Sequence, residues 1–273
     1  MKRFLLSTVF LLAAASNAQQ PPFPFATDHP GHPVICAHRG RLNDTELENS
    51  LSVMRGTYKK GVSMMEFDLR ESNDGEIFLS HDSTLDRTTN ATGELSRHSS
   101  EQLRHTMQRD PVSGDPLEPL TRFSDLLAWA RSTNVLLMVD LKNTPPADAM
   151  KAIRKYGLVH RVILLTFDPK TAQAALSAAP DAQVSMLAHT RQEIDNAIAS
   201  AHGHALALYL PTMGDEALYA YAHTTGKTVI SDALGELDDK ARAEGCRIYK
   251  IYLENHPVDI FVTNHPLAFV SAR

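Results

Sequence analysis

Short apolar runs alternate with helical segments along most of this chain, and the alternation limits the folds open to it. The runs are rich in Val, Ile and Leu, and the helical segments between them span 10 to 20 residues. Such repeats predict a parallel sheet covered by helices. Counting only the runs that a helix separates gives eight predicted strands, which begin at residues 34, 62, 135, 162, 182, 205, 227 and 259.

Eight βα units in about 240 residues favour a closed (β/α)8 barrel, the TIM barrel, over other α/β folds. The main alternative is an open doubly wound sheet. It is disfavoured because no Gly-rich phosphate loop follows the first predicted strand.

One strand-like run, EIFLSHD (76–82), follows the second strand without an intervening helix. The Asp-Gly pair at 74–75 between the two runs is a hairpin signal. Asp68 and His81 lie equally far from the centre of this turn, so we expect the β-hairpin to bring them side by side. The stretch 83–120 is rich in Ser, Thr, Pro and charge, and it is too long for an ordinary loop. We predict an excursion over the barrel mouth, not a second domain.

The N-terminus has the layout of a secretory signal peptide. Lys2 and Arg3 precede an apolar run that ends at residue 15, and small and polar residues follow, so cleavage is expected after Ala18. The run is shorter than the roughly 20 residues of a membrane span, so no stable membrane insertion is expected. We predict an exported protein, periplasmic or secreted, with an uncleaved N-terminal anchor as the alternative. The expected parts are a signal peptide (1–18), an extended lead-in (19–33) and a barrel domain (34–273).

Charge and cysteine content exclude several classes of protein. The formal net charge is −5, and removal of Lys2 and Arg3 with the signal peptide makes it −7. An acidic surface argues against nucleic acid or anionic membranes as the main partner. Cys36 in a predicted strand and Cys246 in a predicted helix are expected to be buried free thiols, although export leaves a disulfide between them open. The oligomeric state is not predicted.

Polar side chains gather at the carboxyl ends of the first three predicted strands, where the catalytic groups of a (β/α)8 barrel lie. Residues two apart in a strand share a face. A parallel strand is otherwise apolar on both faces, so polar groups at three neighbouring strand ends predict a lined site. The groups are His38 and Arg39 on the first strand, Glu66 and Asp68 on the second, and Asp140 and Lys142 on the third.

The three carboxylates of this set predict a metal site. Held together in a partly dry mouth, Glu66, Asp68 and Asp140 would repel one another and raise one another's pKa values. A divalent cation removes that repulsion, and ligation by oxygen alone suits Mg²⁺ or Ca²⁺ better than zinc. The alternative is a salt-bridged network with Arg39 and Lys142 and no metal.

The remaining groups suit cleavage of a phosphodiester. His38 and His81 are two imidazoles near the acidic cluster, and such a pair can take and return a proton near neutral pH. Arg39 and Lys142 are cations suited to a phosphate, Arg through its planar fork and Lys as a point charge. Metal, cations and a paired acid and base together predict a phosphodiesterase.

These residues lie in segments that resemble the glycerophosphodiester phosphodiesterase family, part of the phospholipase C-like phosphodiesterase superfamily. The E-x-D…DG…HD-x-x-LDRTT pattern is a specific signal, unlike a lone HRG. The resemblance covers nearly all of the chain after the predicted signal peptide, in order. The matching segments are AHRG (37–40), ELENS (46–50), EFDLRESNDGEIFLSHDSTLDRTTNATG (66–93), MVDLKN (138–143), LLTFDP (164–169) and DIFVTNHP (259–266).

The resemblance implies a (β/α)8 barrel with a hairpin after its second strand. It also implies a role for each site residue: Glu66, Asp68 and Asp140 as metal ligands, His38 and His81 as the acid–base pair, and Arg39 and Lys142 as phosphate contacts. Glu48 and Asn49 match the E-N that follows the first strand of the family. We expect Glu48 to support the site by hydrogen bonding, although it could instead approach the metal.

Several positions depart from the family pattern. The loop 41–48 is a residue longer than usual and lacks the usual small residues and Pro. Asp140 stands where Glu is usual, as in the related spider-venom-type sphingomyelinase D enzymes. The usual Trp of the seventh strand is absent from VISDA (229–233), and Asn264-His265 replaces Asp-Arg. These changes leave the metal and phosphate chemistry intact and put the specificity for the leaving group in doubt.

We therefore predict an enzyme that hydrolyses glycerophosphodiesters to glycerol 3-phosphate and an alcohol, using one divalent cation. One alternative is a lysophospholipase D or sphingomyelinase D-like phosphodiesterase acting on lipids. A second is a non-catalytic barrel that binds phosphorylated ligands, and a third is an unrelated metal hydrolase of the same fold. The alcohol, the choice between Mg²⁺ and Ca²⁺, and the choice between water and a substrate hydroxyl as nucleophile stay open.

Overall fold

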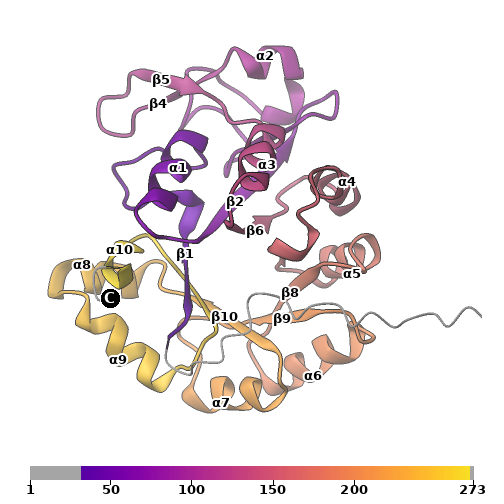
Figure 1. Cartoon of the computed structure of the whole chain (residues 1–273), viewed down its shortest axis with the longest axis vertical. Helices are drawn as coiled ribbons and strands as arrows, with labels where there is room; N and C mark the ends of the chain where they lie inside the picture. The colour runs from indigo at the N-terminus through magenta and orange to yellow at the C-terminus, as the bar shows by residue number, and fades with distance from the viewer. Residues whose placement is uncertain (1–31, 271–273) are drawn as a thin grey trace, which may run out of the picture.

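The computed structural model describes residues 32–270 and contains a closed barrel of parallel strands (Figure 1). Strand β1 pairs with both β2 and β11, so the sheet has no open edge between its first and last strands. The predicted (β/α)8 barrel is confirmed, and each strand begins within two residues of its expected start. The barrel strands are β1 Val34–Ala37, β2 Met64–Glu71, β6 Leu136–Asp140, β7 Val162–Thr166, β8 Gln183–Leu187, β9 Leu206–Tyr209, β10 Thr228–Asp232 and β11 Ile260–Thr263.

Helices surround these strands (Figure 1). Several begin where a short polar side chain accepts a hydrogen bond from the first turn, as Asp168, Thr190 and Asp215 do for α5, α6 and α7. The helices are α1 Leu51–Lys59, α3 Phe123–Arg131, α4 Pro146–Tyr156, α5 Pro169–Ala178, α6 Arg191–Ser200, α7 Glu216–Thr224, α8 Glu236–Glu244, α9 Arg247–Asn255 and α10 Leu267–Val270, with 3-10 turns η1 His38–Gly40 and η3 Val159–Arg161.

The strands separate two apolar cores. Alternate residues of β2, such as Met65 and Phe67, join the core between strands and helices. Met64, on the opposite face, joins a smaller core inside the barrel. Glu66 and Asp68 continue the inward face of Met64 by the two-residue period of a strand. The carboxylates therefore lie at the mouth end of the barrel interior.

The predicted hairpin is present, with its register one residue away from the expected one. β2 pairs antiparallel with β3 Ile77–Leu79, and Leu69 lies opposite Leu79. The turn closes through the Ser72 N–H and the Glu76 carbonyl, so it is centred on Asp74. Asp68 consequently bonds to the backbone of Ser80, not His81. An odd number of turn residues, with Gly75 at φ +85°, produces this shift.

The excursion after the hairpin has a small core of its own. It contains η2 Leu95–Arg97, α2 Ser100–Arg104, and a hairpin of β4 Met107–Arg109 and β5 Pro116–Pro119. Figure 1 shows it at one end of the molecule, beside α1 and α3. The Gln108 amide donates to the Glu48 carbonyl over 2.9 Å, which joins the excursion to the loop after β1. Its core consists of Phe78, Leu85, Leu95, Leu103 and Leu120.

The prediction that Cys246 is buried is wrong. Cys36 and Cys246 are both free, but only Cys36 is buried. The segment expected to be one helix divides into α8 and α9 at Gly245, whose φ is +101°, and Cys246 lies exposed at this break. A residue with positive φ ends an α-helix, which explains the break at Gly245.

The predicted signal peptide and nearly all of the lead-in lie outside residues 32–270. Within the described residues, no helix is long and apolar enough to cross a membrane.

Gly40, at the end of the turn after β1, offers a test of packing. A Cβ there would lie 2.3 Å from Met54 Cγ, and Met54 is fully buried. Gly114 has a similar φ, +79° against +71°, but a Cβ added there would meet nothing within 4 Å. We expect Gly40→Ala to lower the free energy of unfolding by about 1–3 kcal/mol more than Gly114→Ala, measured by denaturant titration. Equal losses in the two variants would contradict this packing.

Candidate active site

The turn after β1 carries two of the predicted site residues and is tied to β2. His38 and Arg39 lie in η1, and Arg39 adopts a positive φ of 51°. The backbone N–H of Arg39 donates to Glu66 Oε2 over 2.8 Å. This bond fixes the turn against the strand that carries the acidic residues.

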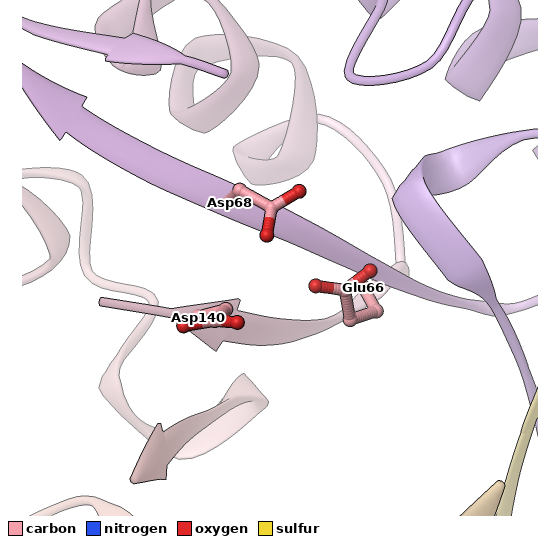
Figure 2. A group of neighbouring side chains, drawn as sticks. All are labelled: Glu66, Asp68 and Asp140. Carbon is pink, nitrogen blue, oxygen red and sulfur yellow. The ribbon is translucent and has the colours of Figure 1, made fainter. Parts of the chain in front are cut away.

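Glu66, Asp68 and Asp140 form one buried cluster (Figure 2). Asp68 of β2 lies opposite Asp140 of β6 in the parallel register, and Glu66 lies two residues before Asp68 on the same face. One oxygen from each carboxylate can be chosen so that all three lie within 4.8 Å of one another. Their exposed fractions are 4%, 1% and 8%, so water screens the charges poorly.

The cluster carries more negative charge than its surroundings balance. Burial, followed by the charges of Asp68 and Asp140, raises the pKa of Glu66 well above its ordinary value. Burial and Asp68 also raise the pKa of Asp140, although Lys142 opposes this shift. Burial alone would lower the pKa of Lys142, but Asp68 and Asp140 raise it above its ordinary value.

The donor set fits a divalent cation. Lys142 Nζ lies 2.6 Å from Asp140 Oδ2 and 3.1 Å from Asp68 Oδ1, as the metal-free alternative requires. Asp68 Oδ1 is nevertheless buried without a well-oriented hydrogen bond. Among the described residues, the basic side-chain nitrogen closest to Glu66 is His38 Nε2, at 3.9 Å. Three carboxylates with unmet charge therefore could hold a cation that prefers oxygen ligands.

Glu48 forms an ion pair with Arg39. Arg39 Nη1 donates to Glu48 Oε2 over 2.9 Å, and Arg39 Nε lies 3.9 Å from Asp68 Oδ2. Burial would raise the pKa of Glu48, but Arg87 and Arg39 lower it to about 2. Glu48 does not belong to the acidic cluster, so it supports Arg39 in this structure.

Asn49 supports Asp68 in a reciprocal pair of hydrogen bonds. Its Nδ2 donates to Asp68 Oδ2 over 2.8 Å, and its Oδ1 accepts from the Asp68 N–H over 3.0 Å. Asn49 has a φ of +56° and Ser50 caps the next helix, so α1 begins at Leu51.

The two histidines have different partners. His38 Nδ1 lies 2.9 Å from Asn264 Oδ1. Burial and the charge of Arg39 lower the pKa of His38. His81 Nδ1 lies 2.8 Å from Asp82 Oδ1. The partner of His81 is therefore a carboxylate, whereas the partner of His38 is an amide.

One cavity of about 390 Å³ joins most of the predicted site residues. Glu48 and Asn49 do not line it, in keeping with a supporting position. Its lining combines polar and apolar side chains. The polar ones are His38, Arg39, Glu66, Asp68, His81, Asp140 and Lys142, and the others are Met138, Leu165, Phe167, Tyr209, Leu234 and Val262.

Sequence reasoning assigned no role to three residues that contact the predicted groups. Asn264 was noted only as a departure from the family pattern, yet it bonds to His38. Arg70 donates to the His81 carbonyl from Nε and Nη2, over 3.0 and 2.7 Å. Its spacing of two residues from Asp68 was an available signal. Arg87 contacts both Glu48 and Asp82, and its position inside the LDRTT segment was the signal for it.

The family follows from comparison with known proteins. A family model for the glycerophosphoryl diester phosphodiesterase family matches residues 38–249. The chain belongs to this family. The predicted family and enzyme class, a phosphodiesterase of glycerophosphodiesters, are thereby confirmed.

Curated relatives match parts of the chain. An uncharacterised protein of Bacillus subtilis is 26% identical over 196 residues, which cover 67% of this chain and 79% of that protein. Glycerophosphodiester phosphodiesterase 1 of Bos taurus is 33% identical over 126 residues, which cover 43% of this chain and 37% of the bovine protein. The chain thus matches about a third of the bovine relative's length.

Solved phosphodiesterase structures share the fold. A glycerophosphoryl diester phosphodiesterase from Parabacteroides distasonis superposes with a TM-score of 0.76 at 22% identity, over 88% of this chain and 85% of that chain. A phosphodiesterase from Oleispira antarctica, solved in complex with the product sn-glycerol-3-phosphate, superposes with a TM-score of 0.72 at 16% identity, over 88% of this chain and 96% of that chain. At these identities the likeness establishes the barrel.

Removing one buried charge from the acidic cluster should stabilise the protein when no cation is present. The pKa of Glu66 is raised above its ordinary value of 4.5. Such a carboxyl stabilises the fold below that pH, and this contribution is lost as pH rises through the folded-state pKa. With chelator present, thermal unfolding should therefore show the wild type losing stability relative to Glu66→Gln as pH rises from 4.5.

Added Mg²⁺ or Ca²⁺ should reverse this order, because a cation that binds only the folded wild type raises its Tm. Glu101→Gln is the matched control, since the Glu101 side chain is 70% exposed and lies on α2. A Glu66→Gln protein that is less stable than wild type in chelator at every pH would contradict the charge imbalance.

Proposed function

We propose that this protein hydrolyses glycerophosphodiesters to glycerol 3-phosphate and an alcohol, with one divalent cation and two histidines. The observation that carries the proposal is the composition of one cavity. It combines an acidic cluster, two cationic side chains and two imidazoles with different partners. Each of these parts serves a separate need of phosphodiester cleavage.

Arg39 and Lys142 would bind the non-bridging oxygens of the phosphodiester. Both cations face the cavity, and both are anchored by carboxylates that prevent them from turning into solvent. Donors fixed before the reaction stabilise charge that develops on the phosphoryl oxygens without reorganising. A divalent cation held by Glu66, Asp68 and Asp140 would supply further stabilisation of that negative charge.

The hydrogen-bond partners of the two histidines support different roles for them. Asn264 Oδ1 is only an acceptor, so His38 donates from Nδ1, and the neutral form of His38 then presents an unprotonated Nε2. His38 would take the proton of the attacking hydroxyl. Asp82 Oδ1 accepts from His81 Nδ1 over 2.8 Å, so this carboxylate orients the His81 ring. His81 would then donate the Nε2 proton to the leaving alkoxide as its bond to phosphorus breaks.

The nucleophile can be water or a neighbouring hydroxyl of the glycerol. Attack by water gives glycerol 3-phosphate directly, whereas attack by the hydroxyl gives a cyclic phosphate first. The Oleispira antarctica relative binds sn-glycerol-3-phosphate, which supports the glycerol phosphate as the part of the substrate that this site holds.

Lipid substrates form the second candidate class, and the apolar side chains in the lining of the cavity favour it. Phe167 is 47% exposed and contacts Tyr209 edge to face, with ring centroids 5.6 Å apart. Leu165 and Leu234 also line the cavity. A lysophospholipid or sphingomyelin would place apolar atoms against these side chains.

The roles of the histidines predict different responses to the leaving group. His81→Ala should lower turnover of glycerophosphoethanolamine by roughly 10²–10⁴-fold. The loss should be much smaller for a 4-nitrophenyl phosphodiester, because 4-nitrophenolate needs little protonation. His38→Ala should lose activity on both substrates. Release of the alcohol and of 4-nitrophenolate measures the two reactions.

His105→Ala is the control, since this side chain is 79% exposed on the excursion. Near-wild-type hydrolysis by His81→Ala would contradict the assignment. A panel that adds a lysophospholipid and sphingomyelin identifies the alcohol, and ³¹P NMR detects a cyclic phosphate. Binding of these compounds without hydrolysis would instead indicate a non-catalytic barrel.

We also propose that the protein acts outside the cytoplasm after cleavage of residues 1–18. The basic start, the short apolar run and the small residues before Gln19 support this location. N-terminal sequencing of protein recovered from the exported fraction should begin at Gln19. Full-length protein confined to the cytoplasmic fraction would contradict the proposal.

A further inference from the structure

Arg87, on the excursion, contacts two carboxylates that belong to different parts of the site. Its Nε and Nη2 donate to Asp82 Oδ2 and Oδ1 over 2.5 and 3.1 Å. Its Nη2 and Nη1 donate to Glu48 Oε1 and Oε2 over 2.6 and 3.0 Å. A planar guanidinium can make two such bidentate contacts, whereas the ammonium of a lysine cannot.

Each carboxylate also holds a group of the proposed reaction. Asp82 accepts from His81 Nδ1 over 2.8 Å. Glu48 accepts from Arg39 Nη1 over 2.9 Å. One guanidinium therefore connects the proposed general acid to a proposed phosphate contact, although Arg87 is not among the residues that line the catalytic cavity.

Arg87 balances part of the negative charge of both carboxylates. The hydrogen bond from Arg87 is the main reason that the pKa of Asp82 lies below its ordinary value. Glu48 is buried and also pairs with Arg39, while Arg41 lies 3.9 Å away. Without Arg87, Arg39 would be the main cation paired with Glu48. The stronger attraction to Glu48 would draw the Arg39 side chain away from a phosphate.

The local fold holds Arg87 in place. Leu85 is fully buried in the core of the excursion. The Thr89 N–H and hydroxyl both donate to the Leu85 carbonyl, over 3.0 and 2.7 Å. The Leu85 N–H donates to the Gly93 carbonyl over 2.9 Å. Arg87 therefore lies in a closed turn whose backbone is fixed independently of the site.

We propose that Arg87 is a positioning residue for the phosphodiester hydrolysis described above. It fixes the Asp82 carboxylate in its hydrogen bond with His81 and the Glu48 carboxylate in its ion pair with Arg39. The excursion thereby orients both an acid–base group and a phosphate contact. The inference rests on the proposed function for its kinetic readout but not for its structural one.

Arg87→Lys keeps the charge and removes the fork, so it tests positioning directly. We expect kcat/KM for a glycerophosphodiester to fall about 10²-fold, as small displacements of catalytic groups do. The fall should divide between a lower kcat, through His81, and a higher KM, through Arg39. In a His81→Ala background, Arg87→Lys should leave kcat nearly unchanged and still raise KM, because residues that act together are not additive.

Arg104→Lys is the matched control. Arg104 also lies on the excursion and bridges two carboxylates, Glu76 and Glu101, and its side chain is 44% exposed against 49% for Arg87. Its kinetic constants should equal those of the wild type. Guanidinium ion should restore activity to Arg87→Ala and methylammonium should not, since Arg87 borders a second cavity of about 390 Å³ that admits small ions.

Nitrogen-15 NMR of the histidine rings separates this inference from the proposed function. The Nδ1 signal of His81 should shift in Arg87→Lys and stay in place in Arg104→Lys, whether or not the wild type hydrolyses any substrate tested. A wild type without hydrolysis would refute the proposed function alone. Unchanged His81 signals together with wild-type kcat and KM in Arg87→Lys would overturn the inference, as would equal losses in the two lysine variants.

Discussion

The repulsion among three buried carboxylates is the constraint on which the mouth of this barrel depends. Asp68 and Asp140 face each other across two paired strands, and Glu66 lies on the same inward face. Inside an apolar barrel such charges cannot all be ionised without a counter-charge. Lys142 supplies part of it and leaves Glu66 without a close basic partner other than His38 among the described residues. A divalent cation is the simplest completion, and it would also stabilise the negative charge that develops in phosphodiester cleavage.

The hairpin and the excursion organise the groups around this charge. The turn at Gly75 returns the chain to the barrel, so Arg70 of β2 can hold the backbone of His81. The excursion then places Arg87 between Asp82 and Glu48. His81 and Arg39, which are 42 positions apart in the sequence, are thus held by one connected set of ionic contacts.

The sequence predicted the barrel and the residues that line its mouth because both depend on local periodicity. Alternation along MMEFDL places Glu66 and Asp68 on one face whatever the tertiary detail. The supporting contacts depend on distances that no period encodes. Asn264 meets His38 only because β11 closes the barrel against β1. The break at Cys246 was not predicted because Gly245 has a positive φ in a segment whose composition favours helix. The hairpin register differs from the predicted one because turn length is set by backbone geometry.

The most direct test is a titration of Mn²⁺ into the metal-free protein, with the bound ion followed by electron paramagnetic resonance. Hydrolysis of glycerophosphoethanolamine is measured on the same samples. The account predicts one tight site per chain, with turnover that rises in proportion to its occupancy. Asp68→Asn should lose the tight site and the turnover together. Full turnover in the metal-free protein, or a tight site that persists in Asp68→Asn, would contradict the claim that the acidic cluster is the centre of the active site.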